Sequence, residues 1–314
     1  MNDELIQVIE DLKMSIYEDM GAETSPNEVE QYVSALLLCL GISGRAKDLP
    51  AVMESINIYA FIDMYDYVLS AWNDRHGMEA CRKLAEHSAE TVNGLSWKNK
   101  FTFQVLLLEN LLLLYQTNRI EIFAQYYDRL DLDILGGHIY EYPEFYAGVF
   151  SELTDVVHDR NGMRMGQMLL DLLPHIDEAA DTDYVLCLAN LCESATCCAL
   201  YDEMSGYYER LGEYRECCYA DMAYLFLLTD LYMAQTAAEK NTHGDREKAE
   251  HLLNQIGEHI SDVEDSELRE ELQIKYLLER SRTAIVGGDY VSALRYTEDG
   301  YSVCKSSMEA HAEY

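Results

Sequence analysis

A small residue recurs at one place in six successive segments of this chain, at intervals of 39 to 44 residues. In each segment it follows a short polar turn, and in five of the six a large apolar or aromatic residue stands three positions later. The six small residues are Ala80, Ala124, Gly166, Ser205, Ala249 and Ala293. Two antiparallel helices approach closely only where a side chain is nearly absent, so the spacing predicts helices packed in pairs. A two-helix repeat of about 40 residues is typical of an α-solenoid, in which each unit buries its apolar face against its neighbours.

Two further features of the sequence favour helices. The chain of 314 residues holds only four prolines, which clash inside a helix, and it has no run of alternating β-branched residues that would indicate a strand. Short polar turns separate the helical segments at 73–77, 117–119, 159–162, 241–245 and 286–289. Near the start, Ser25, Pro26 and Glu28 form a helix-start pattern, and this helix is expected to run to about Gly41. We therefore predict an all-α fold.

The stretches "GGDYVSALRY" (287–296) and "HGDREKAEHLL" (243–253) resemble the second half of a tetratricopeptide repeat, with a Gly-Asp turn and an alanine five residues after the glycine. The other copies are degenerate, and the spacing exceeds the family's usual repeat of about 34 residues, so the first helix of each pair should be longer. As a pattern the resemblance covers residues 58–304. It implies a right-handed α-solenoid of about six to seven antiparallel helix pairs, with a concave groove that binds peptides or protein segments and with no enzymatic activity.

The repeats divide the chain into three parts. Residues 1–57 are expected to form N-terminal helices that cap the array or make its first repeat, and residues 58–304 form the repeats themselves. At 131–143 a double glycine and Pro143 interrupt the regularity, which predicts either a bend or an ordinary loop between repeats. The last second helix is expected to end near Cys304, so that 305–314 begins a further helix, leading to another repeat or an output domain, or serves as a C-terminal cap.

The balance of charge limits the partners of the protein. There are 57 acidic and 23 basic residues, which give a formal net charge of −34. A protein that binds nucleic acid needs a basic face to displace counterions from phosphate, so nucleic acid and anionic membrane surfaces are disfavoured. A basic peptide or protein face would be attracted. The simpler explanation of the acidic surplus is that it keeps a large helical surface soluble.

Neither the start of the chain nor its most apolar run indicates secretion or a membrane. The first residues form an acidic amphipathic pattern without the basic head of a signal peptide. The run "VLLLENLLLLY" is interrupted by Glu109 and Asn110 and is too short to span a bilayer. The nine cysteines include two adjacent pairs and do not resemble a disulfide framework, which favours the reducing cytoplasm.

The sequence carries no common catalytic motif. It lacks GxxxxGK[ST], GxGxxG, HExxH and GxSxG, which weakens nucleotide-binding, zinc-protease and hydrolase interpretations. Six cysteines lie between 187 and 218, but none stands in a CxxC or CxxxC arrangement typical of structural zinc. We therefore predict no metal and no cofactor. We expect four of these cysteines to be buried free thiols, because free cysteine behaves as a small hydrophobe. They are Cys187, Cys192, Cys197 and Cys198.

Polar residues inside the apolar first helices are the candidates for ligand binding. Asn110, Asn190 and Gln235 each stand 14 or 15 positions before the small residue of their repeat, so they would point the same way. Amides both donate and accept hydrogen bonds, which suits the recognition of a peptide backbone. The alternative is that each amide is satisfied inside the array. Tyr115, Tyr146 and Tyr224 lie on first helices and are further groove candidates.

The sequence thus predicts a cytoplasmic, non-enzymatic repeat domain that binds a basic or neutral peptide or protein segment. By analogy with other repeat domains, we expect a regulatory or sensory role in bacterial signalling. Two alternatives remain. A structural assembly subunit would show a large self-complementary apolar interface. An enzyme built on helical repeats would show titratable groups that converge in a deep pocket.

Overall fold

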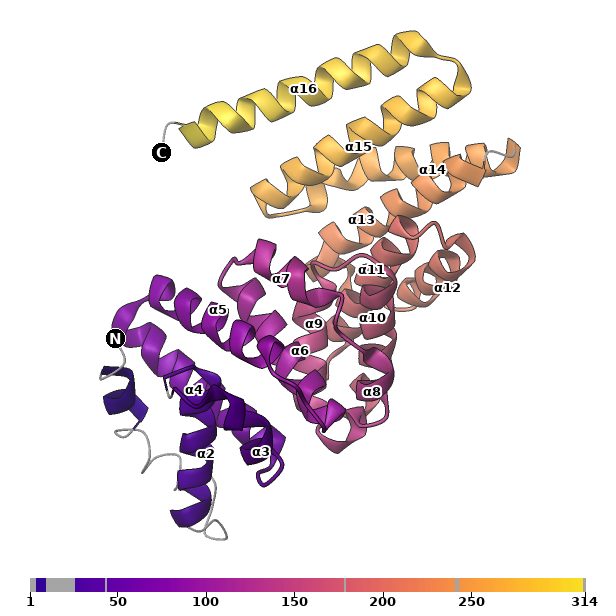
Figure 1. Cartoon of the computed structure of the whole chain (residues 1–314). Coiled ribbons are helices and arrows are strands. Elements are labelled where there is room, and N and C mark those ends of the chain that lie inside the picture. The colour runs from indigo at the N-terminus through magenta and orange to yellow at the C-terminus, as the bar shows by residue number, and fades with distance from the viewer. Residues whose placement is uncertain (1–3, 10–25, 43, 178, 241–242, 313–314) are drawn as a thin grey trace. The chain divides into compact units, whose positions relative to one another are not determined.

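The computed structural model describes residues 4–9, 26–42, 44–177, 179–240 and 243–312, and within these ranges every regular element is a helix (Figure 1). The chain divides into two compact units, Met1–Leu153 and Thr154–Tyr314. The predicted all-α fold is therefore confirmed for the part of the chain that is described. Ser25, the predicted cap of the first long helix, lies outside the described residues.

Among its described residues, unit 1 contains a short helix at 4–9 followed by eight further α-helices. These are α2 (Pro26–Cys39), α3 (Leu49–Met53), α4 (Ile58–His76), α5 (Met78–Gly94), α6 (Lys100–Gln116), α7 (Ile120–Tyr127), α8 (Leu132–Gly136) and α9 (Pro143–Thr154). Two short 3-10 helices, η1 (Ala46–Asp48) and η2 (Ile139–Glu141), connect them. The interruption predicted at 131–143 is thus filled by α8, η2 and the start of α9.

Unit 2 contains seven α-helices among its described residues. They are α10 (Arg160–Leu172), α11 (Asp181–Cys197), α12 (Tyr201–Gly212), α13 (Arg215–Lys240), α14 (His243–His259), α15 (Ser266–Gly287) and α16 (Tyr290–Ala312). The 3-10 helices η3 (Leu173–His175) and η4 (Ile260–Asp262) follow α10 and α14. Helix α13 is kinked at Met222, where φ is −125° and ψ is 28°.

Capping residues and glycines that can be recognised in the sequence mark the ends of several helices. The Asn57 side chain accepts from the amide of Tyr59 at 2.9 Å and so caps α4. Asp159 caps α10 in the same way, accepting from Gly162. Helix α15 ends at Gly288, whose φ of +79° is a left-handed conformation that glycine adopts without a steric penalty. The turns predicted at 73–77, 117–119, 159–162 and 286–289 all lie at helix ends, whereas 241–242 are outside the described residues.

Helices that are neighbours in sequence pack against each other. Helix α5 contacts both α4 and α6, and in unit 2 the pairs α11–α12, α13–α14 and α15–α16 lie side by side (Figure 1). We call the helix before each polar turn the first helix of its pair: α4, α6, α9, α11, α13 and α15. In unit 2 successive first helices also touch, since α13 contacts both α11 and α15. Helix pairing, as predicted from the small-residue spacing, is therefore present.

The small residues themselves behave as predicted at two of their four positions in unit 2 and at neither position in unit 1. Ala249 and Ala293 are buried, and a Cβ at Gly166 would stand 2.8 Å from the Leu191 side chain. Gly166 therefore packs against the following helix α11, rather than against its own first helix. Ser205 and Ala80 are half-buried. Ala124 is exposed, because the short helix α7 packs through Phe123 instead, so the prediction for Ala124 is wrong.

The C-terminal helix differs from the expectation. Helix α16 is continuous from Tyr290 to Ala312, so it does not end near Cys304, and no new helix begins at 306. The stretch after Gly300 contains neither glycine nor proline, and nothing in it interrupts the helical hydrogen bonds. Its final residues, 313–314, lie outside the described residues.

Among the residues that the structure describes, no helix is both long enough and apolar enough to cross a lipid bilayer.

Overpacking at Ala249 tests the role of the small residues. Ala249 is fully buried beside Ala237 and Ala238, so Ala249→Leu should force α13 and α14 apart and lower the free energy of unfolding by about 1–3 kcal/mol. The matched control is Ala124→Leu on exposed α7, which should change stability by less than about 0.5 kcal/mol. Urea denaturation followed by circular dichroism measures both. Equal effects of the two substitutions would contradict the packing argument.

Candidate functional site

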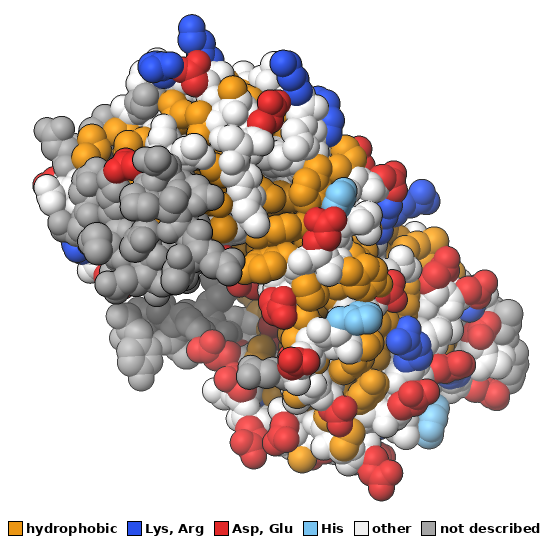
Figure 2. Space-filling view, turned by 90° about the horizontal axis from the view of Figure 1, so that it is seen from below, with side chains coloured by type: hydrophobic (Ala, Val, Ile, Leu, Met, Phe, Trp, Pro, Cys, Tyr) orange, Lys and Arg blue, Asp and Glu red, His pale blue; other side chains and the backbone are white. Residues whose placement is uncertain are grey.

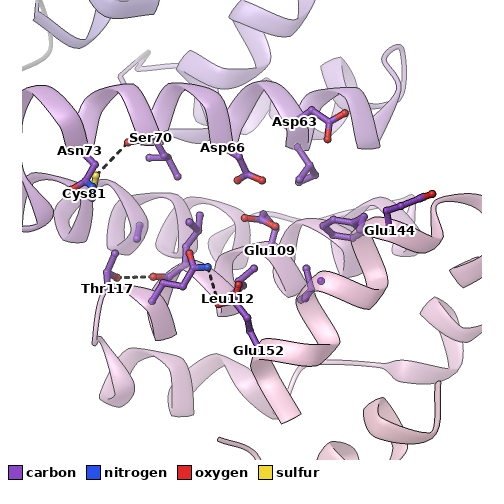
Figure 3. A pocket seen from close by; sticks show the side chains of 18 of the residues that line it. Asp63, Asp66, Ser70, Asn73, Cys81, Glu109, Leu112, Thr117, Glu144 and Glu152 are labelled. Atoms are coloured by element: carbon purple, nitrogen blue, oxygen red, sulfur yellow. Dashed lines mark hydrogen bonds between the residues drawn. The ribbon is translucent and has the colours of Figure 1, made fainter. Parts of the chain in front are cut away.

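The candidate site is a pocket in unit 1 with a cavity volume of about 560 Å³, formed by α4, α5, α6 and α9 (Figure 3). Five acidic residues line it, and none of its described lining residues is Lys, Arg or His. The acidic residues are Asp63, Asp66, Glu109, Glu144 and Glu152. Apolar and aromatic residues complete the wall, among them Leu69, Leu112 and Phe145. The pocket is therefore strongly acidic with apolar patches.

The helical period explains how the acidic side chains reach one cavity. On α4 the lining residues Ile62, Asp66, Leu69 and Asn73 are three or four positions apart, so they share one face of the helix. On α6 the lining residues 109, 112, 113 and 116 have the same spacing, as have 145, 148, 149 and 152 on α9. Three first helices thus each present one stripe to the pocket, and each stripe carries at least one carboxyl group.

Asp66 and Glu109 face each other across the pocket (Figure 3). Their carboxyl groups share a side-chain hydrogen bond. Glu109 is only 2% exposed. Burial raises the pKa of Glu109 well above its usual value, and the charge of Asp66 and the hydrogen bond between them raise it further. These effects favour the proton on Glu109. Two adjacent carboxyls that cannot both ionise share one proton in this way.

Asp66 lies in a different environment from Glu109. The residue is accessible to water, but its carboxyl group is enclosed by the concave wall of the pocket. This partial loss of hydration raises the pKa of Asp66 to about 6, and the neighbouring charge of Asp63 also raises it, whereas the hydrogen bond from Glu109 lowers it. The pair therefore changes its protonation close to neutral pH.

Two of the remaining acidic side chains are held by neutral donors. The Tyr142 hydroxyl donates to Asp63 Oδ2 at 3.0 Å, and the Gln116 amide donates to Glu152 Oε2 at 2.9 Å. Tyr142 is itself fixed by stacking on Tyr59, with ring centroids 4.8 Å apart. These contacts orient the carboxylates toward the pocket without neutralising their charge.

The predicted amides do not line this pocket. Asn110, one residue after Glu109, is buried, and its side-chain amide donates to the carbonyl of Leu106 at 2.6 Å. Asn190 is also buried and donates to Asp155 at 2.6 Å. Gln235 is half-buried, with its amide 3.5 Å from Glu239 Oε1. Asn110 and Asn190 are thus held in the interior of the described structure, although the side-chain oxygen of Asn110 has no hydrogen-bond partner there.

The predicted tyrosines are likewise separate from one another. Tyr146 is fully buried and shares a hydrogen bond with Tyr59, which places it behind the pocket wall rather than in an open groove. Tyr115 is half-buried on α6. Tyr224 is half-buried in unit 2, where its hydroxyl donates to Glu271 at 3.1 Å. None of the hydrogen bonds of the six predicted residues joins two of them.

The cysteines are free thiols, as predicted, but not all of the four named ones are buried. Cys187 and Cys192 are buried, and burial raises the pKa of the Cys187 thiol to about 12. Cys197 is exposed and Cys198 is half-buried, so the prediction is wrong for Cys197. The two lie at the C-terminal end of α11, where the helix face turns toward water.

Sequence reasoning missed the five carboxyls because acidic residues are abundant throughout the chain. One signal was available. Glu109 stands in the middle of the most apolar helix, where a charged residue is costly unless it is paired or neutral. Asp66 and Asn73 also fall on the apolar stripe of α4. Polar residues on an apolar stripe mark a pocket more specifically than acidic residues in general do.

Comparisons of the chain with protein-family models, with curated proteins and with solved structures found no match.

The carboxyl pair predicts how stability depends on pH. The folded-state pKa values of Asp66 and Glu109 are raised, so the folded chain binds more protons than the unfolded chain. The resulting stabilisation is complete below the unfolded pKa values and is lost as pH rises through the folded ones, from about pH 4 to above about pH 6. Glu109→Gln keeps a donor toward Asp66 and removes one of the titrating groups. We therefore expect urea midpoints of this variant to fall less steeply with rising pH than those of the wild type.

The matched control is Glu121→Gln, which removes an exposed acid on α7 that does not line the pocket. It removes one charge from the same strongly acidic chain, so it separates the effect of the buried pair from that of general charge repulsion. A Glu109→Gln slope equal to that of Glu121→Gln would contradict the assignment of the proton to the pair.

Proposed function

We propose that this chain is a peptide- or protein-binding repeat domain whose unit 1 takes a basic side chain of its partner into the acidic pocket. The observation that carries the proposal is the composition of the pocket wall: five carboxyl groups from three consecutive first helices, without a basic residue among the described lining residues. Carboxylates that face one another repel, and a guanidinium or ammonium group would relieve that repulsion. The sequence analysis led to the expectation of a basic or neutral partner.

The size and the walls of the pocket suit part of a peptide. A volume of about 560 Å³ lies within the range of about 300–1,000 Å³ for ligand pockets, and it exceeds what one side chain fills. Leu69, Leu112 and Phe145 offer apolar surface to the aliphatic stem of Lys or Arg, whose charged end would meet Asp63 and Asp66. The aromatic rings of Tyr142 and Phe145 would further stabilise a bound cation through cation–π interactions.

The arrangement of the helices supports a tetratricopeptide-like array as the framework for this function. Helices pack in neighbouring pairs, second helices carry buried small residues in unit 2, and the pocket is built mainly from first helices. First helices line the concave face in a right-handed superhelix of that family. A regulatory or sensory role in bacterial signalling is the context we infer for such a domain, by analogy of architecture.

Catalysis is supported less well than binding. The Asp66–Glu109 pair would meet one requirement of acid–base chemistry, a carboxyl group that stays protonated near neutral pH. The other acids of the pocket, Asp63, Glu144 and Glu152, are exposed, and the cavity is open to water. A bound cation would draw on the exposed carboxylates of the pocket, whereas an acid–base pair leaves these three acids unexplained.

Selection from a peptide library tests the proposal. Peptides of random sequence that bind the purified chain should be enriched in Arg or Lys, and their affinity should fall as salt concentration rises. In the pocket variant Asp63→Asn/Asp66→Asn, the selected peptides should lose affinity by about tenfold or more, because each charge-assisted hydrogen bond contributes about 1.5–3 kcal/mol. Fluorescence anisotropy measures both effects.

The control for this experiment is Glu121→Gln, which removes an exposed acid on α7, away from the pocket wall. This variant should bind the selected peptides as the wild type does. Selected peptides without basic residues, or equal losses in the control and in the pocket variant, would overturn the proposed pocket.

Self-assembly is a second candidate function, favoured by one observation in unit 2. Val291, Leu294 and Tyr301 lie on one face of α16 and are 83%, 61% and 71% exposed. Helix α15 also exposes Leu278 and Ile285. Exposed apolar surface of this kind marks interaction sites when it is contiguous.

Light scattering of the purified chain tests this candidate. A dimer or larger oligomer at about 50 µM that Val291→Glu/Leu294→Glu converts to a monomer would support assembly through α16. A wild-type monomer at that concentration would exclude it, and the pocket experiment would be unaffected.

A further inference from the structure

A cluster of metal-ligating side chains lies in unit 2, where the first turns of α11 and α13 meet. Asp181 begins α11, and the adjacent cysteines Cys217 and Cys218 lie near the start of α13. One ligand atom from each of the three residues lies within 4.8 Å of the other two. This cluster could not be predicted from the sequence, because Asp181 is 36 residues from Cys217 and the cysteines lack CxxC spacing.

We propose that Asp181, Cys217 and Cys218 form a binding site for a thiophilic divalent cation of the zinc type, with a coordination position left open to water. The three protein ligands are a carboxylate oxygen and two thiol sulfurs. On binding, the metal replaces the two thiol protons, which pass to water.

The distances between the ligand atoms match those around a tetrahedral metal ion. With Zn–S bonds of about 2.3 Å and Zn–O bonds of about 2.0 Å, two sulfurs lie about 3.8 Å apart, and a sulfur and an oxygen about 3.5 Å apart. In the structure the Cys217 and Cys218 sulfurs are 3.4 Å apart, and Cys217 Sγ is 3.8 Å from Asp181 Oδ2. These two distances differ from the ideal by less than about 0.5 Å, which small side-chain rotations remove. The third, between Cys218 Sγ and the Asp181 carboxylate, is within 4.8 Å.

The surroundings hold the three ligands in place. Tyr184 on α11 stacks on Tyr214, just before α13, with ring centroids 5.8 Å apart and an angle of 12° between the rings. This contact ties the two helix starts together. The backbone carbonyl of Tyr214 accepts from the Cys217 thiol at 3.2 Å and from the Cys218 amide at 2.9 Å. The geometry is therefore set by elements that pack independently of a metal.

Access and charge also suit a cation. Asp181 and Cys217 are exposed, so an ion can enter from water, whereas Cys218 is buried and supplies the inner ligand. Asp221 adds negative charge close to Cys218. The basic residue at the start of α13, Arg215, is paired with Asp230 at 2.6 Å.

Cobalt is the probe that tests this site, because Co²⁺ bound to thiolate gives a charge-transfer absorption that carboxylates alone do not give. The reduced full-length chain is freed of metal by a chelator and titrated with Co²⁺, and then with Zn²⁺. We expect one thiolate-bound Co²⁺ per chain, displaced by about one equivalent of Zn²⁺, and a Zn²⁺-dependent rise in Tm of about 3 °C or more.

Two variants and one matched control make the test specific. Cys217→Ser alters an exposed residue, and circular dichroism checks that it folds; it should abolish the charge-transfer band. Asp181→Asn should weaken Co²⁺ binding by about tenfold or more. The control Cys197→Ser/Cys198→Ser removes the other adjacent pair of cysteines and should bind Co²⁺ as the wild type does. The proposal is overturned if wild type at about 100 µM Co²⁺ shows no such band, or if the band survives in Cys217→Ser. It is also overturned if Asp181→Asn binds unchanged, or if the control loses the band as well.

Discussion

Burial of helix α6 on all sides is the constraint on which unit 1 depends. Every residue from Thr102 to Leu114 is buried, so this helix has no face that can remain in water. A helix that is apolar all round must be surrounded, and α4, α5, α7 and α8 each pack against it. The same constraint fixes the chemistry of the pocket. A carboxyl group at Glu109 can remain in such a helix only when it is neutral or paired, and Asp66 on α4 supplies the partner.

The helices and their turns could be predicted because their causes are local. Polar turns, caps such as Asn57 and the absence of strand patterns depend on residues close together in sequence. The small-residue rule succeeded at Ala249 and Ala293, where long helices lie side by side over many residues. It failed at Ala124, because α7 spans only Ile120–Tyr127 and contacts its neighbour through Phe123. The break expected after Cys304 was wrong because no glycine or proline follows Gly300 to interrupt the helix.

The candidate site could be predicted only in part, for a geometric reason. Successive residues on a helix point about 100° apart, so Asn110 faces the interior while Glu109 faces the pocket. Counting back from the small residue of a repeat gives the approximate position along the helix. An error of one residue in that count places the side chain on a different face. The surplus of acidic residues indicated the charge of the expected partner but not the place on the chain where it would bind. On the face seen in Figure 2, Asp and Glu side chains are spread widely beside apolar ones. Apart from the apolar surroundings of Glu109 and Asp66, the sequence does not separate those acids from the five that converge.

The hydrogen bond between Asp66 and Glu109 means that the pocket holds a titratable proton in addition to its negative charges. A cation that entered beside these carboxyls would favour their ionised forms and would expel the proton that they share. Binding of a basic partner and retention of this proton therefore oppose each other. By thermodynamic linkage, each event of binding would acidify the solution slightly, and the partner's apparent affinity would rise with pH across the range in which the pair titrates. The chain would thus respond to the acidity of its surroundings without a histidine in the pocket wall.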